Sequence, residues 1–106
     1  MNYIVIYITT PSLEKGQEIA DILVKEKLAA CVNVIPNISS TYFWQGNIEK
    51  DDESLLIIKT RKDKFENLEK RVKEVHPYSV PEIIALPIIA GSNDYLKWID
   101  ESLDRD

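Results

Sequence analysis

The chain has 106 residues, enough for one domain and too few for two, so we expect residues 1–106 to fold as a single unit. Its net charge of −5 argues against nucleic acid as a partner, because nucleic-acid binders usually present a basic patch to the phosphates. The apolar runs are too short to span a membrane, and a single cysteine excludes an intrachain disulfide. No secretory leader is recognisable before the first apolar segment, so we expect a soluble, cytoplasmic protein.

The first third of the chain predicts a strand followed by a helix. Residues 3–9 are almost entirely apolar and favour a strand, which Thr10 and Pro11 would end while starting a helix. Gly16 and Ala20, one turn apart, would let this helix pack closely on a sheet. Apolar side chains recur near helical spacing along it, at Ile19, Ile22, Leu23 and Leu28.

Residues 28–59 indicate one very long β-hairpin. Apolar and polar residues alternate along its first arm, which would place on one face Ala30, Val32, Val34, Pro36, Ile38, Ser40, Tyr42 and Trp44. The sequence Gln45-Gly46-Asn47 favours a tight turn, and the chain would return through a second apolar strand. A fifteen-residue arm is roughly 50 Å long, whereas a domain of this size is about 35 Å across. We therefore expect a neighbouring chain to cover the overhang, and so a homo-oligomer.

The remaining segments predict a helix, a short strand and a closing helix. Asp63 and Glu66 resemble a capping box, and an apolar stripe follows at Phe65, Leu68, Val72 and Val75. Pro77 would end this helix near His76, and residues 82–89 would form the last strand. A helix from Gly91-Ser92-Asn93 would bury Tyr95, Leu96, Trp98, Ile99 and Leu103. This order predicts an α+β fold, a ferredoxin-like βαββαβ sandwich with a long hairpin and a C-terminal helix.

Few residues could carry chemistry, and no catalytic constellation is readable, so we expect no enzyme. Cys31 follows two alanines, which favours a packed thiol over a ligand or nucleophile. His76 could cap a free carbonyl as an imidazolium at the end of its helix, or it could belong to a functional site. The proline-bounded loop 76–82 also brings Tyr78 and Glu82, and rigid loops with such groups often line sites.

Metal binding would depend on symmetry. One chain offers no four ligands at a recognised spacing, but a trimer turns a single His76 or Glu82 into three. A site that combines histidine with Cys31 would suit copper most, and zinc or nickel next. The candidate metal ligands are therefore His76, Cys31 and Glu82, for copper or another divalent cation, with no metal required for folding.

Five ordered segments resemble the CutA divalent-cation tolerance proteins: residues 28–33 (LAACVN), 42–46 (YFWQG), 58–60 (IKT), 76–82 (HPYSVPE) and 95–98 (YLKW). The resemblance implies a ferredoxin-like subunit in a tight homotrimer, whose hairpins pair around the threefold axis. It also implies a role in the response to metal ions, with copper binding described for bacterial members and no established reaction. In a bacterial member the copper contacts involve a first-strand cysteine and two adjacent histidines. Ile8 and Val75 occupy two of those positions here, which leaves His76.

The resulting expectation is a non-enzymatic, cytoplasmic homotrimer with weak divalent-metal binding through His76, together with Cys31 or Glu82. One alternative is a small-molecule or signalling module of the PII type, with ligands in clefts between subunits. An anion could then bind beside the 76–82 loop and Lys59. A second alternative is an interaction scaffold without a small ligand.

Overall fold

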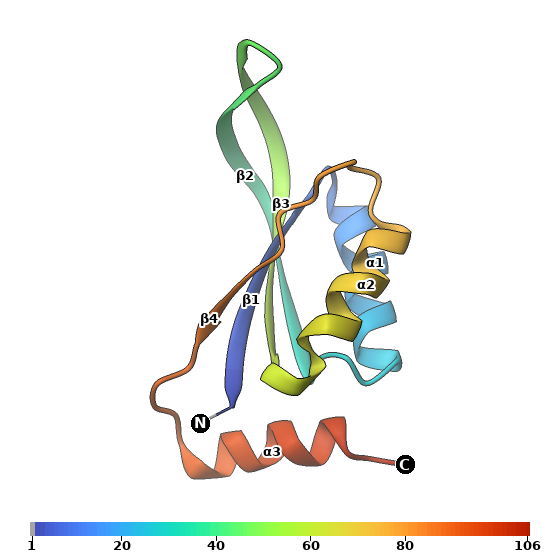
Figure 1. Ribbon diagram of the computed structural model, residues 1–106, viewed down its shortest axis with the longest axis vertical. Coiled ribbons are helices and arrows are strands. Elements are labelled where there is room, and N and C mark those ends of the chain that lie inside the picture. Colours follow the sequence, from blue (N-terminus) through green and yellow to red (C-terminus); the bar gives the residue numbers. More distant parts are fainter. Residues whose placement is uncertain (1) are drawn as a thin grey trace.

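The computed structural model describes residues 2–106, in which four strands form one antiparallel sheet in the order β2-β3-β1-β4. The elements are β1 (Tyr3–Thr10), α1 (Leu13–Lys25), β2 (Cys31–Trp44), β3 (Asn47–Arg61), a 3-10 turn (Lys62–Lys64), α2 (Phe65–Val75), β4 (Ile84–Pro87) and α3 (Asn93–Leu103). Figure 1 shows α1 and α2 on one face of the sheet and α3 across one end. Because β3 lies between β1 and β2, this is the predicted split βαβ arrangement, and the α+β fold class is confirmed.

The main core lies between the sheet and the two helices. Every second residue of β1 is buried, beginning with Ile4, because successive side chains of a strand point to opposite faces. The helices contribute Ile19 and Leu23 from α1 and Leu68 and Val72 from α2. Gly16 lets α1 approach the sheet closely, since an added Cβ would lie 3.2 Å from Val34 Cγ1 and 3.3 Å from Leu56 Cδ2.

Two predicted starts of helices are wrong in detail. Ser12, and not Thr10 or Pro11, caps α1: its side chain accepts a hydrogen bond from the backbone N–H of Lys15. The capping box at Asp63 and Glu66 does not form. Asp63 lies in the 3-10 turn and its carboxylate accepts hydrogen bonds from Arg61 instead, so α2 starts at Phe65 without a side-chain cap.

Two predicted ends also differ. The first helix ends at Lys25, and Lys27 adopts a positive φ of 61°, so Leu28 lies outside the helix and belongs to the turn into β2. The last strand is shorter than residues 82–89 and covers only Ile84–Pro87. Its four residues pair with β1.

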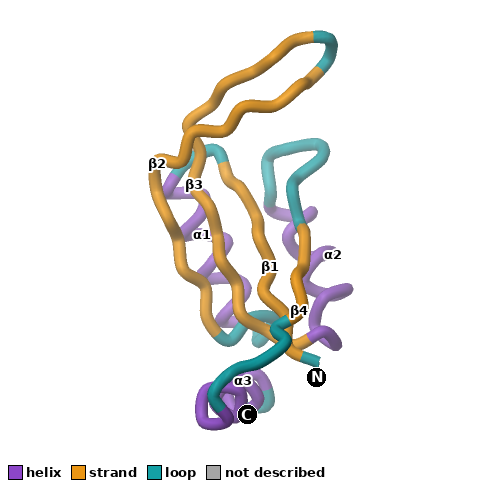
Figure 2. The backbone as a smooth tube through the Cα atoms, turned by 90° about the vertical axis from the view of Figure 1, so that its left-hand side faces the viewer, coloured by secondary structure: helices purple, strands orange, loops and turns teal. Residues whose placement is uncertain are grey.

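A bulge interrupts the first arm of the hairpin. Ile35 pairs with Leu55, but the next pair in the ladder joins Ile38 to Glu53, so β2 contains one more residue than β3 at this point. Asn37 takes a positive φ of 60°, and Pro36 cannot donate to the ladder. The prediction of a single continuous face from Ala30 to Trp44 is therefore wrong. Beyond the bulge the hairpin bends over the loop between α2 and β4 (Figure 2).

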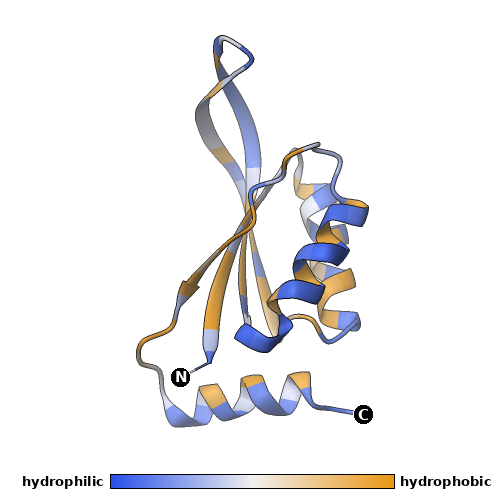
Figure 3. Ribbon diagram, in the orientation of Figure 1, coloured by the Kyte–Doolittle hydropathy of each residue, from blue (hydrophilic) through white to orange (hydrophobic). Residues whose placement is uncertain are grey.

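The expected overhang is present. The hairpin extends beyond the rest of the chain (Figure 1), and the chain with its hairpin measures 45 Å in its longest direction and 26 Å in the next. Large apolar side chains are exposed along it, among them Phe43 at 71% and Ile48 at 73%. The helix-free face of the sheet also exposes Ile35, Ile84 and Leu86. Figure 3 shows β4 and the segment that follows it as largely hydrophobic.

Helix α3 closes the end of the sheet with a second cluster, in which Leu96, Ile99 and Leu103 pack with Ala30. The prediction that Tyr95 and Trp98 are buried is wrong. Both rings are 42% exposed and stack on each other with centroids 5.4 Å apart. No helix within residues 2–106 is both long and apolar enough to cross a bilayer.

Candidate functional site

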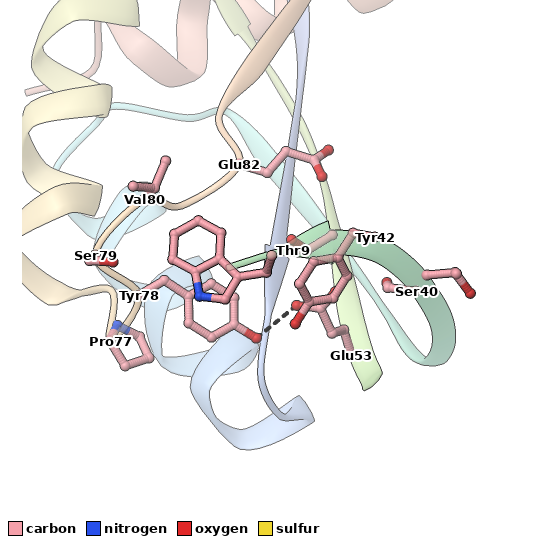
Figure 4. Close-up of a pocket in the computed structure, with 11 residues that line it drawn as sticks. Thr9, Ser40, Tyr42, Glu53, Pro77, Tyr78, Ser79, Val80 and Glu82 are labelled. Atoms are coloured by element: carbon pink, nitrogen blue, oxygen red, sulfur yellow. Dashed lines mark hydrogen bonds between the residues drawn. The ribbon is translucent and has the colours of Figure 1, made fainter. Parts of the chain in front are cut away.

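A pocket of about 650 Å³ lies between the bent hairpin and the loop that joins α2 to β4 (Figure 4). The pocket exists because the bulge in β2 directs the hairpin toward this loop, which two prolines hold in shape. Its lining comes from β1, both hairpin strands and the loop: Thr9, Ser40, Thr41, Tyr42, Trp44, Glu53, Pro77, Tyr78, Ser79, Val80 and Glu82.

Tyr78 joins the loop to the hairpin. Its hydroxyl donates a hydrogen bond of 2.7 Å to a carboxylate oxygen of Glu53, drawn as a dashed line in Figure 4. Glu53 is only 8% exposed. Burial and this bond raise the pKa of the Tyr78 phenol, so the hydroxyl keeps its proton and acts as a donor.

Glu82 supplies the second carboxylate of the pocket. Partial burial raises its pKa above the ordinary value, and the negative charge of Glu53 raises it further. Both causes disfavour the ionised form, so a positive charge placed between these two side chains would be attracted to them.

His76 lies behind the pocket and fixes the loop. It is 7% exposed, and its Nε2 lies 2.8 Å from the backbone oxygen of Thr9 in β1. Its Nδ1 accepts a hydrogen bond of 3.1 Å from the backbone N–H of Tyr78. Both ring nitrogens are therefore in use, and the carbonyl that the ring contacts belongs to β1 and not to the end of α2.

Cys31 lies at the opposite end of the sheet, where β2 begins. Its Sγ is 4.0 Å from Lys59 Nζ and 3.9 Å from Asn33 Oδ1, and Lys59 also donates a hydrogen bond to Asn33. Its neighbour Tyr95 has a pKa raised by burial and by the thiol. Lys59 lies beside Cys31 and is not among the residues that line the pocket, so an anion site formed by Lys59 and the 76–82 loop would need a second subunit.

The three candidate metal ligands are not brought together in one subunit. Glu82 lines the pocket, His76 lies behind it, and Cys31 is at the far end of the sheet. Among residues 2–106 there is no group of three His, Cys, Asp or Glu side chains able to hold a metal ion. Any site built from these residues would need more than one subunit.

Sequence reasoning found the loop but missed Glu53, Thr9 and the carbonyl that holds His76. Glu53 sits within a polar run of β3 with no local signal for a site, and it meets Tyr78 across 25 positions of sequence. Tyr42 and Trp44, which the sequence places on the overhanging part of the hairpin, also line the pocket.

Comparison with known proteins settles the family. The model of the CutA1 divalent ion tolerance protein family matches residues 4–102, nearly the whole chain. This chain belongs to the CutA family. The relationship suggested by the five sequence segments is therefore confirmed.

Individual relatives agree. "Protein CutA, chloroplastic" of Arabidopsis thaliana is 52% identical over 93% of this chain, which spans 54% of that longer protein. "Divalent-cation tolerance protein CutA" of Thermus thermophilus is 51% identical over 92% of this chain and 95% of its own length. A solved structure from Archaeoglobus fulgidus, named there a periplasmic divalent cation tolerance protein, matches with a TM-score of 0.94 at 46% identity, covering 96% of this chain and 99% of the other. The names of these CutA proteins indicate no catalytic activity.

Proposed function

We propose that this chain acts in divalent-cation tolerance as a non-enzymatic homotrimer of the cytoplasm. The observation that carries the proposal is the apolar surface left uncovered: the helix-free sheet face exposes Ile35, Ile84 and Leu86, and the hairpin exposes Phe43 and Ile48. A soluble protein normally covers such a surface with another chain. Three hairpins related by a threefold axis would cover each other's exposed rows, as the family resemblance implies.

The absence of an enzymatic role is supported by the placement of the two most reactive side chains. Cys31 and His76 are the only cysteine and histidine of the sequence, and they lie at opposite ends of the sheet. A thiol nucleophile needs a base within hydrogen-bonding reach. Within one subunit that pair cannot form, and His76 has already committed both ring nitrogens.

Divalent-metal binding, with copper the first choice, would be weak and would occur where subunits meet. Glu82 is the ligand most available, because its carboxylate has no hydrogen bond or ion pair with any residue between 2 and 106. His76 could join only by giving up its bond to Thr9 or to Tyr78, and Cys31 would have to come from another subunit. These costs reduce the affinity for metal. Because His76 already forms its hydrogen bonds without a metal, we expect that folding needs none.

The test is calorimetric titration of metal-free protein with Cu(II) and Zn(II), with the mass measured in parallel by light scattering. We expect a trimer that binds copper in a whole-number ratio to subunits, and weaker binding in Glu82→Gln and in Cys31→Ser. A control variant, Glu101→Gln on the exposed side of α3, should bind as the parent does. A trimer without saturable binding of either metal would contradict the metal proposal and leave the assembly intact.

A second candidate is a small-molecule binding module, and the pocket itself favours it. Ligand pockets in proteins commonly have volumes of roughly 300–1,000 Å³, and this one has about 650 Å³. A thermal-shift screen of metals, nucleotides and small organic molecules separates the two candidates, because a ligand of the folded state raises its stability.

A further inference from the structure

The walls of the pocket combine aromatic rings with carboxylates. The rings are those of Tyr42, Trp44 and Tyr78, and the carboxylates are those of Glu53 and Glu82. The other lining residues carry hydroxyls or are apolar, and none of the eleven is a lysine, an arginine or a histidine. A pocket with this composition repels anions and attracts cations.

No ion pair with residues 2–106 neutralises the negative charge of the pocket. Within residues 2–106 neither Glu53 nor Glu82 forms an ion pair, and Glu53 has a single hydrogen bond, from the neutral phenol of Tyr78. Glu53 is nearly buried, and its charge is felt at Glu82. Two carboxylates that repel each other in a partly desolvated place leave a favourable position for one positive charge.

The aromatic rings favour an organic cation over a bare metal ion. A divalent metal needs several ligands, and the described chain contains no group of three His, Cys, Asp or Glu side chains that could hold one. An ammonium group on an organic body gains from the negative faces of tyrosine and tryptophan rings, and its apolar part gains from their area. Thr9, Ser40 and Ser79 also line the pocket, and a hydroxyl can accept a hydrogen bond from the N–H groups of an ammonium ion.

We propose that this pocket binds a small organic ammonium ion, with its charged nitrogen beside Glu53 and Glu82 and its apolar body against Tyr42, Trp44 and Tyr78. The proposal deepens the second candidate function and rests on it, because it names the chemical class of the small molecule. It is independent of metal binding. Glu82 is the residue that both ideas share, and the aromatic rings are what distinguish them.

Three compounds of nearly equal size and different charge test the proposal: 2-phenylethylamine, which is cationic at neutral pH, 2-phenylethanol, which is neutral, and phenylacetate, which is anionic. Each is titrated by calorimetry into the full-length protein in its native oligomeric state, with chelator present to exclude metal. We expect saturable binding of the amine, binding of the alcohol roughly tenfold weaker, and no measurable binding of phenylacetate.

Two variants separate the contributions of charge and ring. Glu82→Gln should weaken amine binding about tenfold and leave alcohol binding unchanged, whereas Trp44→Leu should weaken both. Glu101→Gln on α3 serves as the charge-matched control and should bind as the parent does. Glu82 and Trp44 are both exposed, so neither variant should unfold the subunit, and an unchanged mass and thermal midpoint verify this.

Equal binding of all three compounds, or tighter binding of phenylacetate, would overturn the choice of a cation while keeping a small-molecule site. If none of the three compounds binds, the pocket is not a site for an organic ligand. That is the result expected if a neighbouring subunit fills the space. Copper binding in the absence of chelator is measured separately, so a failure of this proposal and a failure of the metal proposal give different results.

Discussion

The most informative substitution is His76→Ala, because His76 was expected as a metal ligand and the structure gives it a positioning role. The ring joins the loop to β1 through two hydrogen bonds, of 2.8 Å to the Thr9 oxygen and 3.1 Å from the Tyr78 N–H. It is also 4.8 Å from the ring of Tyr78, centroid to centroid. Alanine would remove all of these contacts.

The expected cost follows from the groups that lose their partners. Leaving a buried backbone donor or acceptor unpaired costs about 1–3 kcal/mol each, so two such groups cost about 2–6 kcal/mol before the missing ring is counted. His76→Gln can supply one donor and one acceptor at a similar reach, so it should recover part of that loss. Ser79→Ala, an exposed change in the same loop, should have little effect.

The assay is urea unfolding at one fixed protein concentration, since the stability of an oligomer depends on concentration. The order of stability should be parent and Ser79→Ala, then His76→Gln, then His76→Ala. A second readout follows the pocket, where amine binding should weaken in His76→Ala because Tyr78 loses its anchor. Unchanged stability in His76→Ala, together with loss of copper binding, would refute the positioning role and make His76 a ligand.

Three further predictions concern charge and packing. Arg61 lowers the pKa values of Asp63 and Asp104 below 3.8, so these pairs stabilise the fold above that pH and lose their effect as pH falls through the lowered values. Arg61→Met should therefore lower the urea midpoint at neutral pH, and its effect should shrink progressively as the pH falls below 3.8; an effect independent of pH would show that these ion pairs do not stabilise the fold. The pKa of Glu82 is raised from 4.5, so its ionised form opposes folding once the pH rises above the raised pKa. Glu82→Gln should therefore slightly raise the thermal midpoint at neutral pH, measured without ligand. A lowered midpoint would show that Glu82 has a favourable partner. Gly16→Val should destabilise the protein by about 1–3 kcal/mol in urea, because even a Cβ would lie 3.1–3.3 Å from its neighbours, and an unchanged midpoint would mean that α1 can move away from the sheet.

Much of the fold could be predicted because its signals are local. The apolar run at residues 3–9 and the proline after His76 each report a structure through neighbouring residues. The bulge was the main miss, although Pro36 and Asn37 both carry hints: one cannot donate to the ladder, and the other tolerates a positive φ. One extra residue exchanged the two faces of the arm, which a simple alternation cannot anticipate.

The site was only half predictable for the same reason. The loop was recognised from its prolines and its polar side chains, all within seven residues. Its partners lie far away in sequence: the carbonyl of Thr9 is 67 positions from His76, and Glu53 is 25 positions from Tyr78. The predicted burial of Tyr95 and Trp98 failed for a different reason. Their spacing fits a buried face, but the docking of α3 buries Leu96 and Ile99 and leaves the two rings outside.

The central claim is that copies of this chain cover the helix-free sheet face and the hairpin, and the most direct test is the mass in solution by light scattering. The parent protein should have three times the subunit mass of 12.2 kDa. Leu86→Glu, which places a charge on the exposed row of β4, should dissociate into subunits and so approach 12.2 kDa. Lys97→Glu, an exposed change on α3, should leave the trimer intact. A parent protein of 12.2 kDa, or a Leu86→Glu variant that remains trimeric, would contradict this account.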